Sequence, residues 1–169
     1  MMKNKTPVNL VTPRQVFTDP VHFFAFGFGS GLSPIMPGTC GTIAAIPIYL
    51  LLQYLPLPYY IITVFILTLL GFWLCDVSAK KIGVHDYSGI VWDEIVGFLW
   101  VMVAVPLHWY WILAGFLLFR LFDIWKPWPI RWLDQKVKGG VGIVVDDLVA
   151  ALYAWIVLQI IIALSSRIA

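Results

Sequence analysis

Residues 59–75 read YYIITVFILTLLGFWLC, an apolar run without a charged side chain. A helix that continues from this run to Lys80 is long enough to cross roughly 30 Å of hydrocarbon at about 1.5 Å per residue. The whole chain has a matching composition: of its 169 residues, 61% are hydrophobic and only 12% are charged, whereas soluble domains carry about 25% charged residues. We therefore predict that the solvent of this protein is lipid.

Further apolar segments flank this run, at residues 43–55, 90–105, 107–125 and 142–165. Residues 21–42 are also apolar, but their glycines and prolines exclude a regular spanning helix. The sequence predicts an all-α membrane protein, a bundle of about five hydrophobic helical segments, some short or re-entrant. We expect a polar cytosolic tail at residues 1–20 and a single membrane-embedded domain at residues 21–169, without an internal repeat.

The charged residues gather on one face of the expected bundle. If the N-terminus is cytosolic, ten of the eleven Lys and Arg residues lie on the cytosolic side, and only Arg167 lies outside. All nine acidic residues lie on the cytosolic side as well, which the positive-inside rule does not explain. This second bias indicates a polar site that faces the cytosol.

Two acidic pairs, Asp93-Glu94 and Asp146-Asp147, stand near the starts of apolar segments. Ionised carboxylates at membrane depth are unfavourable by several kcal/mol unless they are paired or bound to a metal. Together with Asp123 they are candidate ligands of Mg²⁺, which prefers oxygen ligands and often keeps water and substrate phosphate in its shell. The alternative is that each pair only stabilises the N-terminus of a helix.

A stripe of ionisable residues, Arg120, Asp123 and Lys126, repeats at a spacing of three along an expected helix. Asp123 could bind the metal while Arg120 and Lys126 hold phosphate oxygens. The alternative is a set of side chains that snorkel to the membrane surface. The candidate catalytic residues are therefore Asp93, Glu94, Asp123, Arg120 and Lys126.

Residues 27–42 read GFGSGLSPIMPGTCGT and are rich in glycine and hydroxyl groups. Glycines let backbone N–H groups approach an anion, and hydroxyl groups add donors. The segment lacks the Gly-Lys-Ser/Thr ending of a nucleotide-binding loop, and close helix packing is the alternative role. The candidate substrate-binding residues are Gly29, Ser30, Gly31, Ser33, Thr39, Thr42 and Arg131.

The two cysteines, Cys40 and Cys75, do not form a phosphatase loop. The Cys-x5-Arg pattern requires Arg six residues after the cysteine, where this chain has Ile46 and Lys81. We expect chemistry that does not depend on a thiol.

Several motifs, in the same order along the chain, resemble the bacterial phosphatidylglycerophosphatase A family. They are GSGLSP at 29–34, PGT at 37–39, VWDE at 91–94, Phe119-Arg120 with Asp123, KPWPI at 126–130, Gly139-Gly140, Gly142-Ile143 and Asp146-Asp147. The resemblance runs from residue 20 to residue 155 and implies a Mg²⁺-dependent, multi-pass enzyme of the bacterial inner membrane. Such an enzyme removes the terminal phosphate of phosphatidylglycerophosphate to give phosphatidylglycerol in phospholipid biosynthesis.

The mechanism favoured at this stage is direct attack of a metal-activated water on phosphorus, with the carboxylates as metal ligands and base. A mechanism through a covalent aspartyl-phosphate intermediate is the alternative. The alternatives to a phosphatase are a CDP-alcohol phosphatidyltransferase, whose Asp-Gly motif is missing here, and a small transporter. The expected partner is the anionic lipid in the membrane; no nucleic acid and no protein partner are expected.

Overall fold

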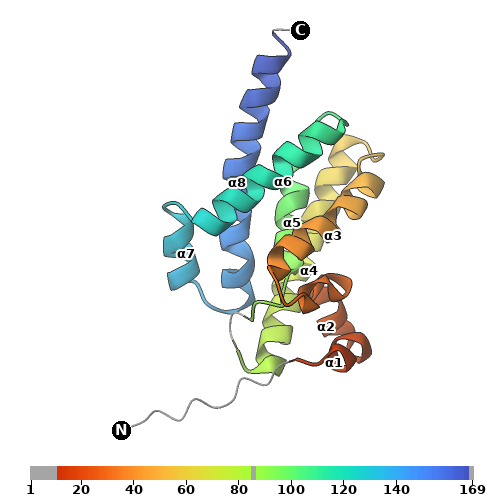
Figure 1. The fold of residues 1–169 in the computed structure, drawn as a ribbon, viewed down its shortest axis with the longest axis vertical. Coiled ribbons are helices and arrows are strands. Elements are labelled where there is room, and N and C mark those ends of the chain that lie inside the picture. The colour runs from red at the N-terminus through yellow and green to blue at the C-terminus, as the bar shows by residue number, and fades with distance from the viewer. Residues whose placement is uncertain (1–10, 85–86, 168–169) are drawn as a thin grey trace.

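The computed structural model describes residues 11–84 and 87–167, and this part of the chain contains helices and no β-strand. The predicted all-α class is therefore confirmed for the described residues. The α-helices are labelled in Figure 1, and the elements run in the order α1 (Pro13–Thr18), α2 (Pro20–Ala25), the 3-10 helix η1 (Gly27–Leu32), α3 (Pro37–Leu52), α4 (Leu57–Ile82), α5 (Trp92–Val101), α6 (Trp109–Trp125), α7 (Ile130–Lys136) and α8 (Gly139–Ser165).

Helices α4 and α8 are the longest elements. They have 26 and 27 residues, and both are long and apolar enough to cross a membrane. Large apolar side chains on their surfaces, such as Ile66 and Ile160, are exposed, as they would be toward lipid. Together these features indicate a membrane protein. Helices α3, α5 and α6 overlap the other expected apolar segments but are shorter than α4 and α8.

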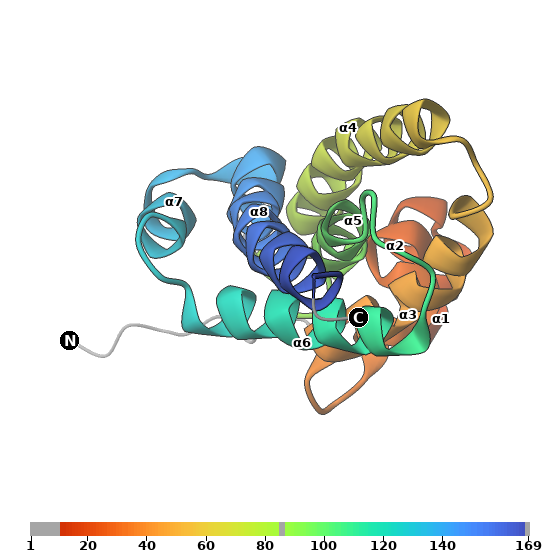
Figure 2. The same cartoon turned by 90° about the horizontal axis from the view of Figure 1, so that it is seen from above.

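Helix α5 lies at the centre of the bundle, where it packs against α3, α4, α6 and α8 (Figure 2). Most of its side chains are buried. The Tyr60 hydroxyl of α4 donates a hydrogen bond to the Leu99 carbonyl at 2.7 Å, and Trp92 donates to the Leu67 carbonyl at 3.1 Å. These contacts fix both ends of α5, so the acidic pair in its first turn has a fixed position.

The glycine-rich stretch at residues 21–42 folds as α2, η1 and the start of α3, so the predicted absence of one regular spanning helix is confirmed. Phe28 and Gly29 break the helical path with positive φ angles of 60° and 96°. Gly31 lies so close to the next loop that an added Cβ would be 2.0 Å from the Gly89 carbonyl oxygen. Helix α3 starts at Pro37, earlier than the expected residue 43, because proline is favoured in the first turn of a helix.

The second half of the expected tail is folded onto the bundle, whereas residues 1–10 lie outside the described residues. Val16 of α1 is completely buried. Asp19 forms an ion pair with Lys81 of α4 at 2.5 Å. The folded part of the chain therefore begins before residue 21.

Residues 130–136, expected as part of a polar stretch, form α7, and α8 begins close beside α4. The Gly140 N–H donates a hydrogen bond to Asp76 at 3.1 Å. A Cβ on Gly140 would lie 2.1 Å from the Phe72 carbonyl oxygen, so only glycine allows this approach. The contact sets the position of α8, and with it that of Asp146 and Asp147.

Candidate active site

A cavity of about 410 Å³ opens at the end of the bundle where α3, α5 and α8 begin and α6 ends. All five predicted metal ligands line it, together with Arg120 and Lys126. Its full lining consists of Met36, Pro37, Gly38, Ser88, Ile90, Asp93, Glu94, Arg120, Asp123, Ile124, Lys126, Asp134, Val137, Gly142, Ile143, Asp146 and Asp147.

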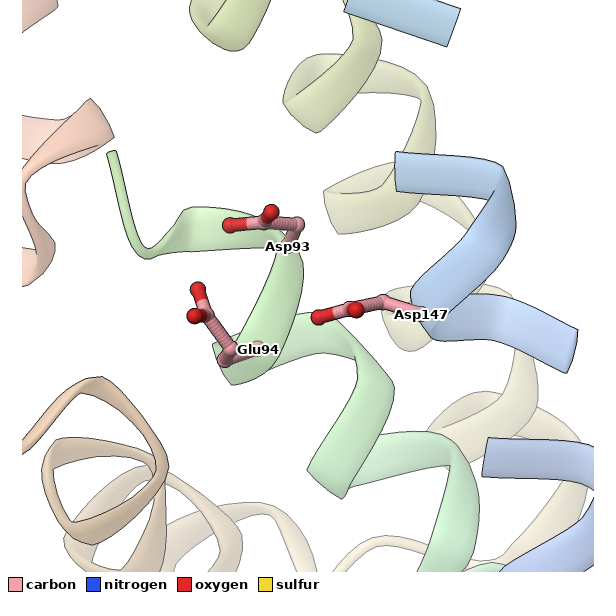
Figure 3. A group of neighbouring side chains, drawn as sticks. All are labelled: Asp93, Glu94 and Asp147. Atoms are coloured by element: carbon pink, nitrogen blue, oxygen red, sulfur yellow. The ribbon is translucent and has the colours of Figure 1, made fainter. Parts of the chain in front are cut away.

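Three carboxylates from two helices converge inside this acidic cavity. Asp93 and Glu94 come from the first turn of α5, and Asp147 comes from the third turn of α8 (Figure 3). One oxygen from each of the three lies within 4.8 Å of the others, a spacing that could hold a metal ion. Asp93 and Asp147 are only 8% and 4% exposed. Residues more than fifty positions apart in sequence thus form one buried group.

Several of these carboxylate oxygens have no hydrogen-bond partner among the described residues. The unpaired buried atoms include Oδ1 of Asp93, Oε2 of Glu94 and Oδ2 of Asp147. A buried charge without a partner is strongly unfavourable, whereas a divalent cation would bind oxygens of this kind. The donor set fits Mg²⁺, which takes carboxylate oxygens as ligands.

Arg120 and Asp123 form a close ion pair on α6. Nη1 of Arg120 lies 2.5 Å from Oδ2 of Asp123 and 4.0 Å from Oε1 of Glu94, and all three side chains are largely buried. Within the described ranges, Nε of Arg120 has no hydrogen-bond partner. The guanidinium can therefore still donate to an anion that enters the cavity.

Lys126 joins two carboxylates on the other side of the cavity. Its ammonium lies 2.6 Å from Asp146 and 2.9 Å from Asp134. Burial alone would lower the pKa of Lys126, but the hydrogen bonds to Asp146 and Asp134 raise it above its ordinary value. The lysine therefore stays charged, and Asp146 has a cation from the protein itself.

The residues predicted to bind substrate are not among those that line the acidic cavity. Three of their hydroxyl groups donate to nearby backbone carbonyls: Ser30 to Phe26, Ser33 to Ile35 and Thr42 to Gly38. Gly31 packs against the 87–91 loop instead. Their role in binding stays a prediction for Gly29, Ser30, Gly31, Ser33, Thr39, Thr42 and Arg131.

Sequence reasoning did not assign Gly38 and Asp134 to the site, although both line the cavity. A Cβ on Gly38 would lie 2.2 Å from Oε1 of Glu94, so the side chain of Glu94 needs a glycine there. The Pro37-Gly38 pair at the start of α3 could have pointed to Gly38 as a position where the backbone approaches another group closely. Asp134 had no such signal, because its partnership with Lys126 depends on the turn between α6 and α7.

Fold and cavity together define a helical membrane protein with a buried carboxylate cluster suited to a divalent cation. The profile of the phosphatidylglycerophosphatase A family matches residues 23–162. The chain belongs to this family, as the sequence motifs indicated.

Curated relatives agree with this membership. The chain is 50% identical over 138 residues to phosphatidylglycerophosphatase A of Escherichia coli, covering 81% of this chain and 80% of that protein. It is 48% identical over 141 residues to phosphatidylglycerophosphatase A of Haemophilus influenzae, covering 82% and 86%. A Bacteroides thetaiotaomicron protein, named as a candidate phosphatidylinositol-3-phosphatase, is 40% identical over 144 residues, covering 79% and 88%. No solved structure matches the chain significantly.

Proposed function

We propose that this chain hydrolyses the terminal phosphate monoester of phosphatidylglycerophosphate, giving phosphatidylglycerol and inorganic phosphate. Membership of the phosphatidylglycerophosphatase A family supports this activity. The observation that carries the chemistry is the convergence of Asp93, Glu94 and Asp147 beside the cations Arg120 and Lys126. Carboxylates that hold a metal, next to cations that hold phosphate, suit phosphoryl transfer to water.

The proposed cofactor is Mg²⁺, held by Asp93, Glu94 and Asp147. Asp123 and Asp146 line the same cavity but already have Arg120 or Lys126 as partners, which suits them to a supporting role. A bound Mg²⁺ would neutralise phosphate charge and make water a stronger nucleophile.

The side chains of the cavity would then divide the work. Arg120 and Lys126 neutralise charge on the phosphoryl oxygens as the bond between phosphorus and the glycerol oxygen breaks. A carboxylate of the cluster takes a proton from the attacking water and gives it to the leaving glycerol oxygen. The products are a free hydroxyl on phosphatidylglycerol and inorganic phosphate.

We also propose that the cavity faces the cytosol, with the protein in the bacterial inner membrane. The charged residues of the cavity lie toward the end of the bundle that holds α1 and α2, as do Lys80, Lys81 and α7. The turns between α3 and α4 and between α5 and α6 carry no charged residue. This distribution supports cytosolic placement of the charged end. A cysteine introduced at Gln135 should not react with an impermeant reagent in intact cells; labelling there would overturn this orientation.

The decisive experiment is phosphate release by the purified chain from phosphatidylglycerophosphate. We expect release with Mg²⁺, loss with EDTA and recovery when Mg²⁺ is returned. The variant Asp147→Asn, which preserves the shape of the side chain, is the matched comparison for the wild-type chain, and we expect it to release phosphate much more slowly. Release that persists unchanged in EDTA would exclude the metal, and no release under any condition would exclude the hydrolysis.

A further inference from the structure

Helix α6 has two different faces near the acidic cavity. Arg120 and Asp123 point into the cavity. The adjacent face carries exposed apolar side chains that recur at intervals of three and four, which places them on one side of the helix. This apolar stripe consists of Leu113, Leu117, Leu121, Ile124 and Trp125.

A shallow groove runs along the stripe and meets the acidic cavity. The groove has three lining residues that do not reach the cavity, Leu117, Leu121 and Trp125. Two further residues, Arg120 and Ile124, line both the groove and the cavity. Ile124 is 62% exposed, so the junction between the two spaces is open to the outside of the bundle. A molecule could therefore place a charged group in the cavity and an apolar group along α6.

The stripe is comparable in length to an acyl chain. From Leu113 to Trp125 the helix rises roughly 18 Å along its own axis at about 1.5 Å per residue. Helix α6 is inclined to α8 (Figures 1 and 2), so this is a length along the helix and not a depth in the bilayer. One leaflet contributes roughly 15 Å of the hydrocarbon core, so an acyl chain of that length could follow the stripe while its headgroup lies at the cavity.

We propose that the apolar stripe of α6 binds the acyl chains of the substrate lipid while its terminal phosphate occupies the acidic cavity. This inference rests on the proposed function and adds the route by which the lipid reaches the site: sideways from the membrane, past Ile124. The headgroup then passes Arg120 on its way to the carboxylates, and the acyl chains stay in lipid throughout.

A second apolar groove, between α4 and α8, is the main competitor. Its volume is about 510 Å³, and its lining includes Phe65, Trp100, Leu152 and Trp155. None of its lining residues belongs to the acidic cavity. A lipid held there would have no continuous path from its acyl chains to the carboxylates, so the α6 stripe is the better site.

Photo-crosslinking tests the inference without requiring turnover. The wild-type chain is placed in phosphatidylcholine vesicles with phosphatidylglycerophosphate that carries a diazirine in one acyl chain. We expect adducts between residues 113 and 125, several-fold stronger than with phosphatidylcholine that carries the same diazirine. Equal labelling by both probes would show only ordinary surrounding lipid and overturn the inference, as would headgroup-dependent adducts confined to residues 148–156. Phosphate release from the same vesicles tests the hydrolysis separately.

Kinetics of paired tryptophan variants provide the second test. The variant Leu117→Trp with Leu121→Trp fills the groove on α6 without adding a charge. The variant Leu152→Trp with Ile156→Trp makes the same change on exposed positions of α8 and is the matched control. We expect the α6 variant to raise KM for a long-chain substrate about 5- to 10-fold, a loss typical of disturbing one apolar contact, and to leave the rate on a dihexanoyl substrate unchanged. An unchanged KM in the α6 variant, or an equal rise in the control, would overturn the proposal.

Discussion

The two groups of carboxylates in this molecule differ in their partners. At the end of α4, Asp19 and Asp76 each form an ion pair with a lysine, at 2.5 and 2.6 Å. In the acidic cavity, Asp93, Glu94 and Asp147 each have a buried oxygen that finds no hydrogen-bond partner in the part of the chain that the structure describes. The protein supplies each carboxylate of the first group with a close lysine, whereas among the described residues the second group has only the longer contact of 4.0 Å between Arg120 and Glu94.

This difference separates structural from chemical roles. A paired carboxylate near the surface contributes at most about 1 kcal/mol to stability, and its loss changes little else. A buried carboxylate without a protein partner is unfavourable for folding, so its presence indicates a ligand or a reaction.

The largest effect is expected from Asp93→Asn and from Asp147→Asn. Each change preserves shape but removes one charge from the three-carboxylate cluster. We expect kcat to fall by about 10²- to 10³-fold, because electrostatic stabilisation of the phosphoryl group is lost. Phosphate release across a Mg²⁺ series measures this, and high Mg²⁺ should partly restore a ligand variant.

The control for these variants is stability in detergent. Removing an unpaired buried charge should leave the melting temperature unchanged or raise it. Near-normal activity in both variants would contradict the metal site and leave the Asp93-Glu94 pair with only a stabilising role at the start of α5.

The next effect is expected from Gly38→Ala. The added methyl would lie 2.2 Å from Oε1 of Glu94 and 3.2 Å from Nη1 of Arg120, so both side chains must move. A displacement near 1 Å at a reacting group lowers the rate by about 10²-fold. Gly83→Ala is the matched control, because an added methyl there meets nothing within 4 Å. It should lower stability by about 1 kcal/mol through its positive φ and leave kcat unchanged. Equal kcat values for the two variants would contradict this packing role.

Lys126→Met should have an intermediate effect on both activity and stability. It removes a cation from the cavity and leaves Asp146 buried without its partner, which should destabilise the fold by about 3 kcal/mol. Adding Asp146→Asn should restore the melting temperature but not the rate. Recovery of activity in the double variant would show that Lys126 acts only through Asp146.

Asp19→Asn should have a small effect, limited to stability. The hydrogen bond from Lys81 holds the pKa of Asp19 below its ordinary value, so the pairing stabilises the fold above that value and is lost only in stronger acid. Asp19 also accepts the Val21 N–H as the N-cap of α2, which an asparagine still does, so the expected loss is that of the ion pair alone, about 0.5 kcal/mol. The loss should be constant from pH 6 to pH 8 in thermal unfolding; a loss that grows across this range would point to another titrating group.

The smallest effect is expected from Cys40→Ala combined with Cys75→Ala. Neither sulfur lines the acidic cavity, and Cys75 is completely buried. Phosphate release should stay within about two-fold of wild type, because a metal-assisted reaction needs no thiol. Complete loss in a folded variant would indicate thiol chemistry instead.

Parts of this arrangement follow directly from the sequence. Membrane-depth carboxylates are unfavourable wherever they occur, so Asp93, Glu94, Asp146 and Asp147 could be assigned to one site from composition and order alone. The helical class followed from the apolar runs. The division of the acidic residues into paired and unpaired ones could not be predicted, because it depends on which cation each side chain reaches.

Other parts depended on distances that no local pattern contains. Helix α7 was read as a polar stretch, since its seven residues are too few to show a clear helical period. The hydroxyl-rich segment suggested anion binding, which stays a prediction, and the hydrogen bonds from the hydroxyls of Ser33 and Thr42 to nearby carbonyls could not be read from the sequence. Such side chains compete locally for the backbone, and sequence alone does not say which partner they choose.

The length of α8 links the site to the physical state of the membrane. At 27 residues it measures about 40 Å, roughly 10 Å more than the hydrocarbon core. A helix that is too long for its bilayer tilts or thickens the lipid around it. Because α4, α5, α6 and α7 all pack on α8, a tilt moves the bundle as a unit. We therefore expect the depth of Asp147 below the surface to depend in part on bilayer thickness, so that lipid composition would act on this enzyme mechanically as well as through its substrate.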